Sequence, residues 1–190
     1  MIKIGVTGSI SSGKTTASKI LSRNRGPLFN ADKIVKKFYG SSSFKKLLIK
    51  KFSAQKNLNL NLKNFIKGKI LKDKINIKKL EGIIHPMVRK EMRKFSIKNK
   101  KKKILFYEIP LLIESKLTKY FDIIIFIKAS KKIRLERFKS KGGNKTLFNI
   151  LNKKQWPQSK KIKFCNHVVV NEKNLNILKK NLLDIIKNYV

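Results

Sequence analysis

The feature of this chain that most constrains its fold is a glycine-rich motif close to the N-terminus. Residues 8–15 read GSISSGKT and fit the pattern G-x-x-x-x-G-K-[ST]. A short apolar run at 2–6 precedes the motif, and a helical pattern follows it over residues 15–23. A buried strand, a glycine-rich turn and a helix in this order predict the phosphate-binding loop of a nucleotide-binding α/β protein.

Each fixed position of this loop has a physical role. Glycines allow the backbone to turn tightly and to approach phosphate oxygens without a Cβ in the way. Loop N–H groups and the N-terminus of the following helix attract the anion, while Lys14 is expected to reach the β- and γ-phosphates. The Thr15 hydroxyl is expected to bind Mg²⁺. We therefore predict an ATP-binding loop made of Gly8, Ser11, Ser12, Gly13, Lys14, Thr15 and Thr16.

The rest of the chain alternates between apolar runs and segments with helical spacing. The apolar runs predict further strands at 28–29, 104–109, 121–127 and 168–170. The helical spacing predicts a helix at 131–140, another that ends near 154, and a final amphipathic helix at 175–189. This alternation predicts an α/β fold, a P-loop nucleotide-kinase-like parallel sheet flanked by helices.

We expect residues 1–190 to form a single P-loop kinase domain of three parts. They are a core at about 1–52 and 103–190, a helical substrate-binding insertion at about 53–102, and a lid at about 134–155. Within the insertion, His85-Pro86 is expected to interrupt the helical pattern before a helix over residues 88–95.

The net charge has two interpretations. Lys and Arg number 48 against 10 acidic residues, a formal net charge of +38, which would attract nucleic acid and other anions. The excess is nearly all Lys, accompanies many Ile, Asn and Phe residues with A- and T-rich codons, and is spread along the whole chain. We favour compositional bias over a selected surface and expect no specific nucleic-acid partner.

The sequence also bears on the compartment. No apolar run approaches the roughly 20 residues that cross a bilayer, and the single cysteine, Cys165, cannot form an internal disulfide. We expect a cytoplasmic protein with no membrane partner, and we make no prediction of its oligomeric state.

Further motifs, in order and spacing, resemble the dephospho-CoA kinase family from residue 2 to about 171. They are Asn30-Ala31-Asp32, His85-Pro86 with Arg89, Pro110 to Glu114, Arg137 with Lys141, Gln155 and Asn171. The resemblance implies that ATP, with Mg²⁺, phosphorylates the ribose 3′-hydroxyl of dephospho-CoA to give coenzyme A and ADP, the last step of coenzyme A biosynthesis. The alternatives are another small-molecule or nucleotide P-loop kinase, and a basic nucleic-acid-binding protein with a vestigial loop.

The resemblance implies that Asp32, Lys14 and Arg137 are catalytic. Asp32 lies just past the second strand, where ligands bind in such sheets, and its carboxylate could accept or orient the hydroxyl proton or help to hold Mg²⁺. Its structural alternative is the N-cap of a helix that begins near Lys33. Arg137 and Lys141 are four residues apart, so we expect them to share a helix face and meet phosphates, whereas Lys141 could instead face solvent.

The remaining candidates concern the acceptor and the metal. The resemblance implies that His85, Arg89 and Glu114 bind dephospho-CoA, with a structural histidine and a helix cap as the alternatives for His85 and Glu114. The implied metal ligands are Thr15, Asp32 and Glu108, the last through water. The chain departs from the family's usual residues at Asn30, Glu108, Lys141, Leu151 and Asn166-His167.

Overall fold

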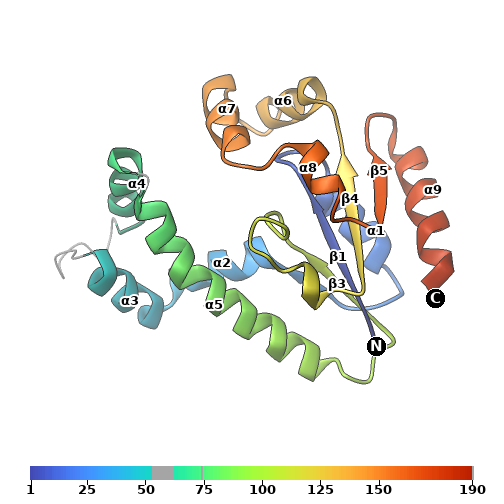
Figure 1. Ribbon diagram of the computed structural model, residues 1–190, viewed down its shortest axis with the longest axis horizontal. Helices are drawn as coiled ribbons and strands as arrows, with labels where there is room; N and C mark the ends of the chain where they lie inside the picture. Colours follow the sequence, from blue (N-terminus) through green and yellow to red (C-terminus); the bar gives the residue numbers. More distant parts are fainter. Residues whose placement is uncertain (53–61, 74, 190) are drawn as a thin grey trace. The chain divides into compact units, whose positions relative to one another are not determined.

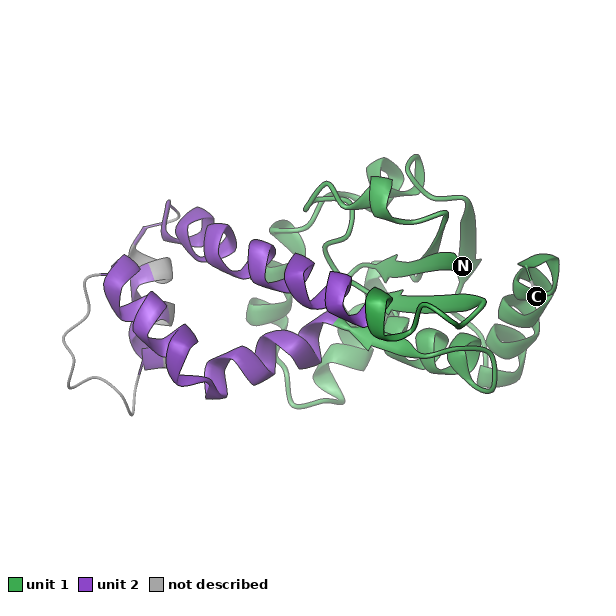
Figure 2. Ribbon diagram, turned by 90° about the horizontal axis from the view of Figure 1, so that it is seen from below, with its two compact units in different colours: residues 1–30, 96–190 green, residues 31–95 purple. Residues whose placement is uncertain are grey.

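The computed structural model describes residues 1–52, 62–73 and 75–189, which form two compact units. The first, the sheet unit, comprises Met1–Asn30 and Ser96–Val190, and the second, the helical unit, comprises Ala31–Phe95 (Figure 2). The boundaries between the two units fall after residues 30 and 95, whereas we expected boundaries near 53 and 102. The reason is that the helices following residue 30 pack against the next helices of the chain.

The sheet unit is built on five parallel strands. They are β1 (Ile2–Gly8), β2 (Leu28–Asn30), β3 (Ile104–Glu108), β4 (Ile123–Lys128) and β5 (His167–Val170), in the order β2-β3-β1-β4-β5 (Figure 1). The parallel sheet and all five predicted strands are confirmed. Because the strands are parallel, the segments that follow them emerge at one edge of the sheet, where Asn30 pairs in register with Glu108.

One face of the sheet is covered by α1 (Lys14–Ser22) and α9 (Leu175–Ile186), with a short 3₁₀ helix, η3 (Lys187–Tyr189), after α9. Side chains on a strand alternate between faces, so Ile4 and Val6 point into this core. Leu178, Leu182 and Ile186 repeat every four residues and give α9 its buried stripe. The final amphipathic helix predicted from the sequence is therefore confirmed.

Three helices and one 3₁₀ helix complete the sheet unit. They are η2 (Thr118–Tyr120), α6 (Lys131–Lys139), α7 (Lys145–Lys153) and α8 (Gln158–Ile162), of which η2 and α8 were not predicted. The expectation that Arg137 and Lys141 share a helix face is wrong, because α6 ends at Lys139. Lys141 lies in the exposed turn that follows, where Gly142 has a φ of +82°.

The helical unit consists of α2 (Ala31–Gly40), α3 (Ser42–Phe52), α4 (Leu62–Lys72) and most of α5 (Ile75–Lys98). Its core contains Phe44, Leu48, Phe52, Leu62, Ile66 and Ile83. The predicted break at His85-Pro86 is wrong, because α5 continues through Pro86. A proline removes one backbone hydrogen bond, but the buried side chains on both sides of it, Ile83 and Val88, anchor the two halves of the helix.

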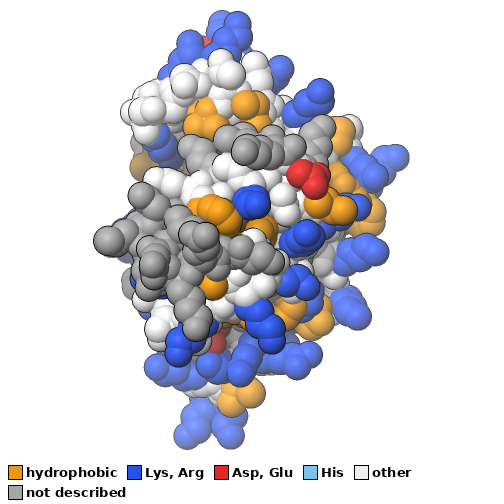
Figure 3. All heavy atoms as spheres, turned by 90° about the vertical axis from the view of Figure 1, so that its left-hand side faces the viewer, with side chains coloured by type: hydrophobic (Ala, Val, Ile, Leu, Met, Phe, Trp, Pro, Cys, Tyr) orange, Lys and Arg blue, Asp and Glu red, His pale blue; other side chains and the backbone are white. Residues whose placement is uncertain are grey.

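The surface carries the excess charge seen in the sequence. Figure 3 shows many Lys and Arg side chains, mostly towards the margins of the face in view, and few acidic ones. Within the described residues, no helix is both long enough and apolar enough to span a bilayer.

Candidate nucleotide-binding site

The loop between β1 and α1 has the backbone that a phosphate-binding loop requires. Gly13 has a φ of +93°, in the left-handed region that favours glycine, and a Cβ there would collide with the Asn171 side chain. A Cβ on Gly8 would lie 2.5 Å from the Ile127 carbonyl oxygen. Ser11 also has a positive φ, of +56°. Residues with positive and negative φ therefore alternate along the loop, as they do in the anion-binding backbone turns called nests. Both glycines of the predicted motif are thus dictated by the fold.

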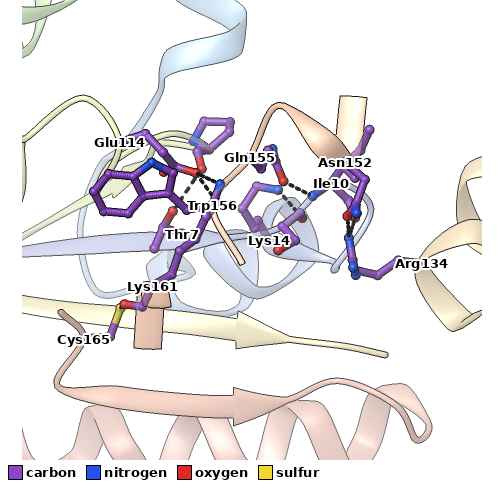
Figure 4. A network of polar contacts seen from close by, with 12 residues as sticks. Thr7, Ile10, Lys14, Glu114, Arg134, Asn152, Gln155, Trp156, Lys161 and Cys165 are labelled. Carbon is purple, nitrogen blue, oxygen red and sulfur yellow. Dashed lines mark hydrogen bonds and ion pairs between the residues drawn. The ribbon is translucent and has the colours of Figure 1, made fainter. Parts of the chain in front are cut away.

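Residues from distant parts of the sequence hold this loop in place (Figure 4). The Ile10 N–H donates to Gln155 Oε1 at 2.9 Å, and Asn171 Nδ2 donates to the Ser12 carbonyl at 2.8 Å. Lys14, which is almost fully buried, donates from Nζ to the Ser9 carbonyl at 2.9 Å. The loop is therefore fixed at three carbonyl or amide groups, and the Lys14 ammonium lies along it.

A carboxylate lies beside the first turn of α1. Thr15 Oγ1 donates to Glu108 Oε1, and Asn30 Nδ2 donates to Glu108 Oε2, each at 2.5 Å. Glu108 is 2 % exposed. Hydroxyl and carboxylate oxygens are the hard ligands that Mg²⁺ takes, and this ion keeps several waters and substrate oxygens. The pair fits that ion, although no described group of three or more His, Cys, Asp or Glu side chains could hold a metal by itself.

Two arginines of α6 lie near the loop. Arg137 Nη1 is buried, has no hydrogen-bond partner among the described residues, and is 3.8 Å from the position a Cβ on Gly13 would take. A buried guanidinium nitrogen in such a place suits an anionic partner. Arg134 is 4 % exposed and donates to the Ala129 carbonyl at 3.1 Å and to Asn152 Oδ1 at 2.7 Å, which joins α6 to α7. Burial lowers the pKa of Arg134.

Sequence reasoning did not identify Arg134 as part of this site. Its spacing of three from Arg137 would place both on neighbouring positions of α6, but an arginine in so basic a chain carries no distinguishing signal. The sequence also did not show that Gln155 and Asn171 contact the loop, although both residues belong to the motifs that resemble the family.

Glu114 makes its contacts within the sheet unit. Its Oε1 lies 2.5 Å from Lys161 Nζ and accepts the Trp156 N–H at 3.2 Å (Figure 4). The Lys161 side chain is fully buried and that of Glu114 is 13 % exposed. Neither of the alternatives weighed for Glu114, a substrate ligand and a helix cap, includes these two contacts.

The other predicted residues belong to the helical unit. Asp32 is exposed and lies in the first turn of α2, which begins at Ala31, so it does not precede the helix as an N-cap would. His85 and Arg89 are half-buried on α5, four residues apart. Burial lowers the pKa of His85, and the nearby Arg89 charge lowers it further, while Glu81 opposes both effects.

The comparisons with known proteins agree with one another. A family model described as dephospho-CoA kinase matches residues 2–176. A dephospho-CoA kinase of Rickettsia typhi is 30 % identical over 189 residues, which are 99 % of this chain and 97 % of that protein. One of Fusobacterium nucleatum is 32 % identical over 179 residues, 92 % of each chain.

Solved structures share the fold. The crystal structure of TT1252 from Thermus thermophilus matches with a TM-score of 0.84 at 23 % identity, covering 100 % of this chain and 98 % of that one. A dephospho-CoA kinase from Campylobacter jejuni matches with a TM-score of 0.62 at 22 % identity, covering 98 % and 96 %. With a phosphate-binding loop of the required geometry and a family match over residues 2–176, the chain belongs to the dephospho-CoA kinase family.

Proposed function

We propose that this chain transfers the γ-phosphate of ATP to the ribose 3′-hydroxyl of dephospho-CoA, giving coenzyme A and ADP. The observation that carries the proposal is the family match over residues 2–176, which encloses the whole glycine-rich loop and the residues that support it. The match favours this reaction over the other P-loop kinase and nucleic-acid-binding alternatives considered from the sequence.

The nucleotide end of the reaction is assigned to the loop and its neighbours. In the proposed complex, the N–H groups of residues 8–16 surround the phosphates, and Lys14 leaves the Ser9 carbonyl to contact the β- and γ-phosphates. Thr15 and Glu108 would hold Mg²⁺, directly or through water. The ion would neutralise charge on the phosphate oxygens when bound. The 2.5 Å contact between Thr15 and Glu108 supports this assignment, because it brings two hard oxygen ligands together.

The acceptor end is assigned to Asp32, with Arg137 at the transferring group. The 3′-oxygen attacks the γ-phosphorus, the bond from that phosphorus to the bridging oxygen of ADP breaks, and Asp32 accepts or orients the hydroxyl proton. The buried, unpartnered Nη1 of Arg137 supports its assignment to charge on the phosphoryl oxygens. Lys141 is assigned a weaker, long-range role from its exposed turn.

The helical unit is assigned the rest of dephospho-CoA. His85 and Arg89 lie one turn apart on α5, and Arg89 is the proposed partner of the acceptor's phosphates. We further propose that the protein works in the cytoplasm with ATP, Mg²⁺ and dephospho-CoA as its partners, and without a membrane or a specific nucleic acid.

The direct test is to incubate the purified chain with ATP, Mg²⁺ and dephospho-CoA at moderate salt, and to follow coenzyme A and ADP by mass spectrometry. Lys14→Ala and Asp32→Asn are assayed alongside. Equimolar coenzyme A and ADP from the native chain, largely lost in both variants, is the expected result. A folded chain that binds ATP but forms no coenzyme A would refute the assignment of the acceptor.

A further inference from the structure

The most unusual electrostatic feature outside the loop is the ion pair between Lys161 of α8 and Glu114. The two other ion pairs found among the described residues, Lys94–Glu91 and Lys187–Asp184, are exposed and lie within single helices. Lys161 is completely buried, and Glu114 Oε2 is buried without a hydrogen-bond partner in the described part of the chain. Burying two charges costs desolvation energy, so the pair calls for a reason beyond stability.

The contacts of Glu114 lead towards the nucleotide loop. Its Oε1, which is 2.5 Å from Lys161 Nζ, also accepts the Trp156 backbone N–H at 3.2 Å. The preceding residue, Gln155, accepts the Ile10 N–H of the loop through its side chain at 2.9 Å. Figure 4 draws the contacts of Glu114 with Lys161 and Trp156 together with that of Gln155 with Ile10. A short chain of contacts thus runs from Lys161 to Ile10.

The backbone on either side of Trp156 has little freedom to move. Pro157 follows Trp156 directly and restricts its backbone, and α8 begins at the next residue. Gln158 fixes the start of α8 by donating from Nε2 to the Ala129 carbonyl at 2.9 Å. The position of Gln155 therefore depends on where the Trp156 N–H finds its acceptor, and that acceptor is a buried carboxylate.

We propose that Lys161 and Glu114 are positioning residues for the nucleotide site. The Lys161 ammonium holds the Glu114 carboxylate in place through their 2.5 Å contact, Glu114 accepts the Trp156 N–H, and Gln155 is thereby held against the Ile10 N–H of the phosphate-binding loop. This assigns Glu114 to the ATP side of the reaction and not to the acceptor. The inference rests on the proposed nucleotide binding but does not depend on which acceptor is used.

The test compares two double variants that both lack buried charge, so that misfolding from an unpaired ion is avoided. Glu114→Gln with Lys161→Met retains an oxygen acceptor for the Trp156 N–H, whereas Glu114→Leu with Lys161→Met does not. The Kd for ATP with Mg²⁺ is measured by calorimetry without dephospho-CoA. Trp156, the single tryptophan of the chain, reports the local structure by its emission. Lys163→Met, an exposed lysine at the end of α8, is the matched control.

We expect the leucine variant to bind ATP about tenfold more weakly than the native chain, with altered Trp156 emission, because a buried N–H loses its acceptor. The glutamine variant should stay within about threefold of native, and Lys163→Met should not change. The single variant Lys161→Met should also bind ATP about tenfold more weakly than the native chain, and adding Glu114→Gln should restore the affinity.

Equal ATP affinity in the two double variants, with both melting below the native chain, would make the pair purely structural and overturn the proposal. Absence of ATP binding by the folded native chain would overturn it together with the nucleotide site. Native ATP binding without coenzyme A formation would refute only the proposed acceptor, and the comparison of the two variants would still decide this inference.

Discussion

The two units of the molecule contribute to the proposed reaction in different ways. In the sheet unit, polar side chains of the candidate site make hydrogen bonds to one another or to the loop backbone, such as Thr15 to Glu108 and Gln155 to the Ile10 N–H. In the helical unit, the core is aromatic and aliphatic, and the candidate residues Asp32 and Arg89 lie outside that core. A parallel sheet gathers the chemistry-bearing ends of its strands at one edge, whereas a helical unit presents side chains along helices.

This difference suggests a division of labour. We propose that residues of the sheet unit bind ATP and that residues of the helical unit recognise the acceptor. This assignment would be contradicted by a variant in one unit that impairs the function proposed for the other unit.

The largest effect is expected from Lys14→Ala in the sheet unit. Removing the ammonium that we propose to contact the β- and γ-phosphates should lower kcat/KM for ATP by about 10²–10³-fold. Steady-state kinetics with varied ATP would measure it, and Lys19→Ala, an exposed lysine of α1, is the control. An equal loss in Lys19→Ala would mean that bulk charge, and not the loop lysine, binds ATP.

The next largest effect is expected from truncating a buried side chain in the core of either unit. Leu48→Ala in the helical unit and Leu21→Ala in the sheet unit each remove a fully buried side chain and should each lower the free energy of unfolding by about 2–5 kcal/mol. Hydrogen exchange should show Leu48→Ala loosening α3 and α4 while β1 and β4 keep their protection, and Leu21→Ala doing the reverse. Uniform loss of protection in both variants would show that the two units unfold as one.

Arg89→Ala tests the proposed binding of dephospho-CoA by the helical unit, with a smaller expected effect. We expect KM for dephospho-CoA to rise about tenfold, as for the loss of one charged contact to phosphate, with the Kd for ATP unchanged. Arg93→Ala, on an exposed position of the same helix, should leave both constants unchanged. A rise in the ATP Kd of Arg89→Ala would contradict the division.

The smallest expected effect is the pH dependence of the helical unit. Burial lowers the pKa of His85 in the folded chain, so the unfolded chain binds more protons near that pKa. Stability is therefore complete above the unfolded value of about 6.5 and is lost as the pH falls through the lower folded pKa. The melting temperature of His85→Gln should fall less between pH 7 and pH 5 than that of the native chain, and equal slopes would refute the assignment.

The sequence predicted the sheet well because its signals are local. The loop motif, the β-branched runs and the final amphipathic helix each follow from residues close together in the chain. What it missed depends on tertiary contacts: Pro86 is tolerated because buried neighbours hold α5, and α6 ends before Lys141. Nothing in the sequence distinguishes the buried Lys161 from the many lysines on the surface, since burial is a property of the folded chain.

We propose that the helical unit supplies the group that acts on the acceptor while the sheet unit binds ATP. The most direct measurement is Asp32→Asn assayed twice, for the Kd of ATP with Mg²⁺ and for the turnover of dephospho-CoA to coenzyme A, with the exposed Asp184→Asn as control. We predict an ATP Kd within about twofold of native and a turnover lowered about 100-fold or more. Turnover that matches the native chain, or a loss of ATP binding as large as the loss of turnover, would contradict the role proposed for Asp32.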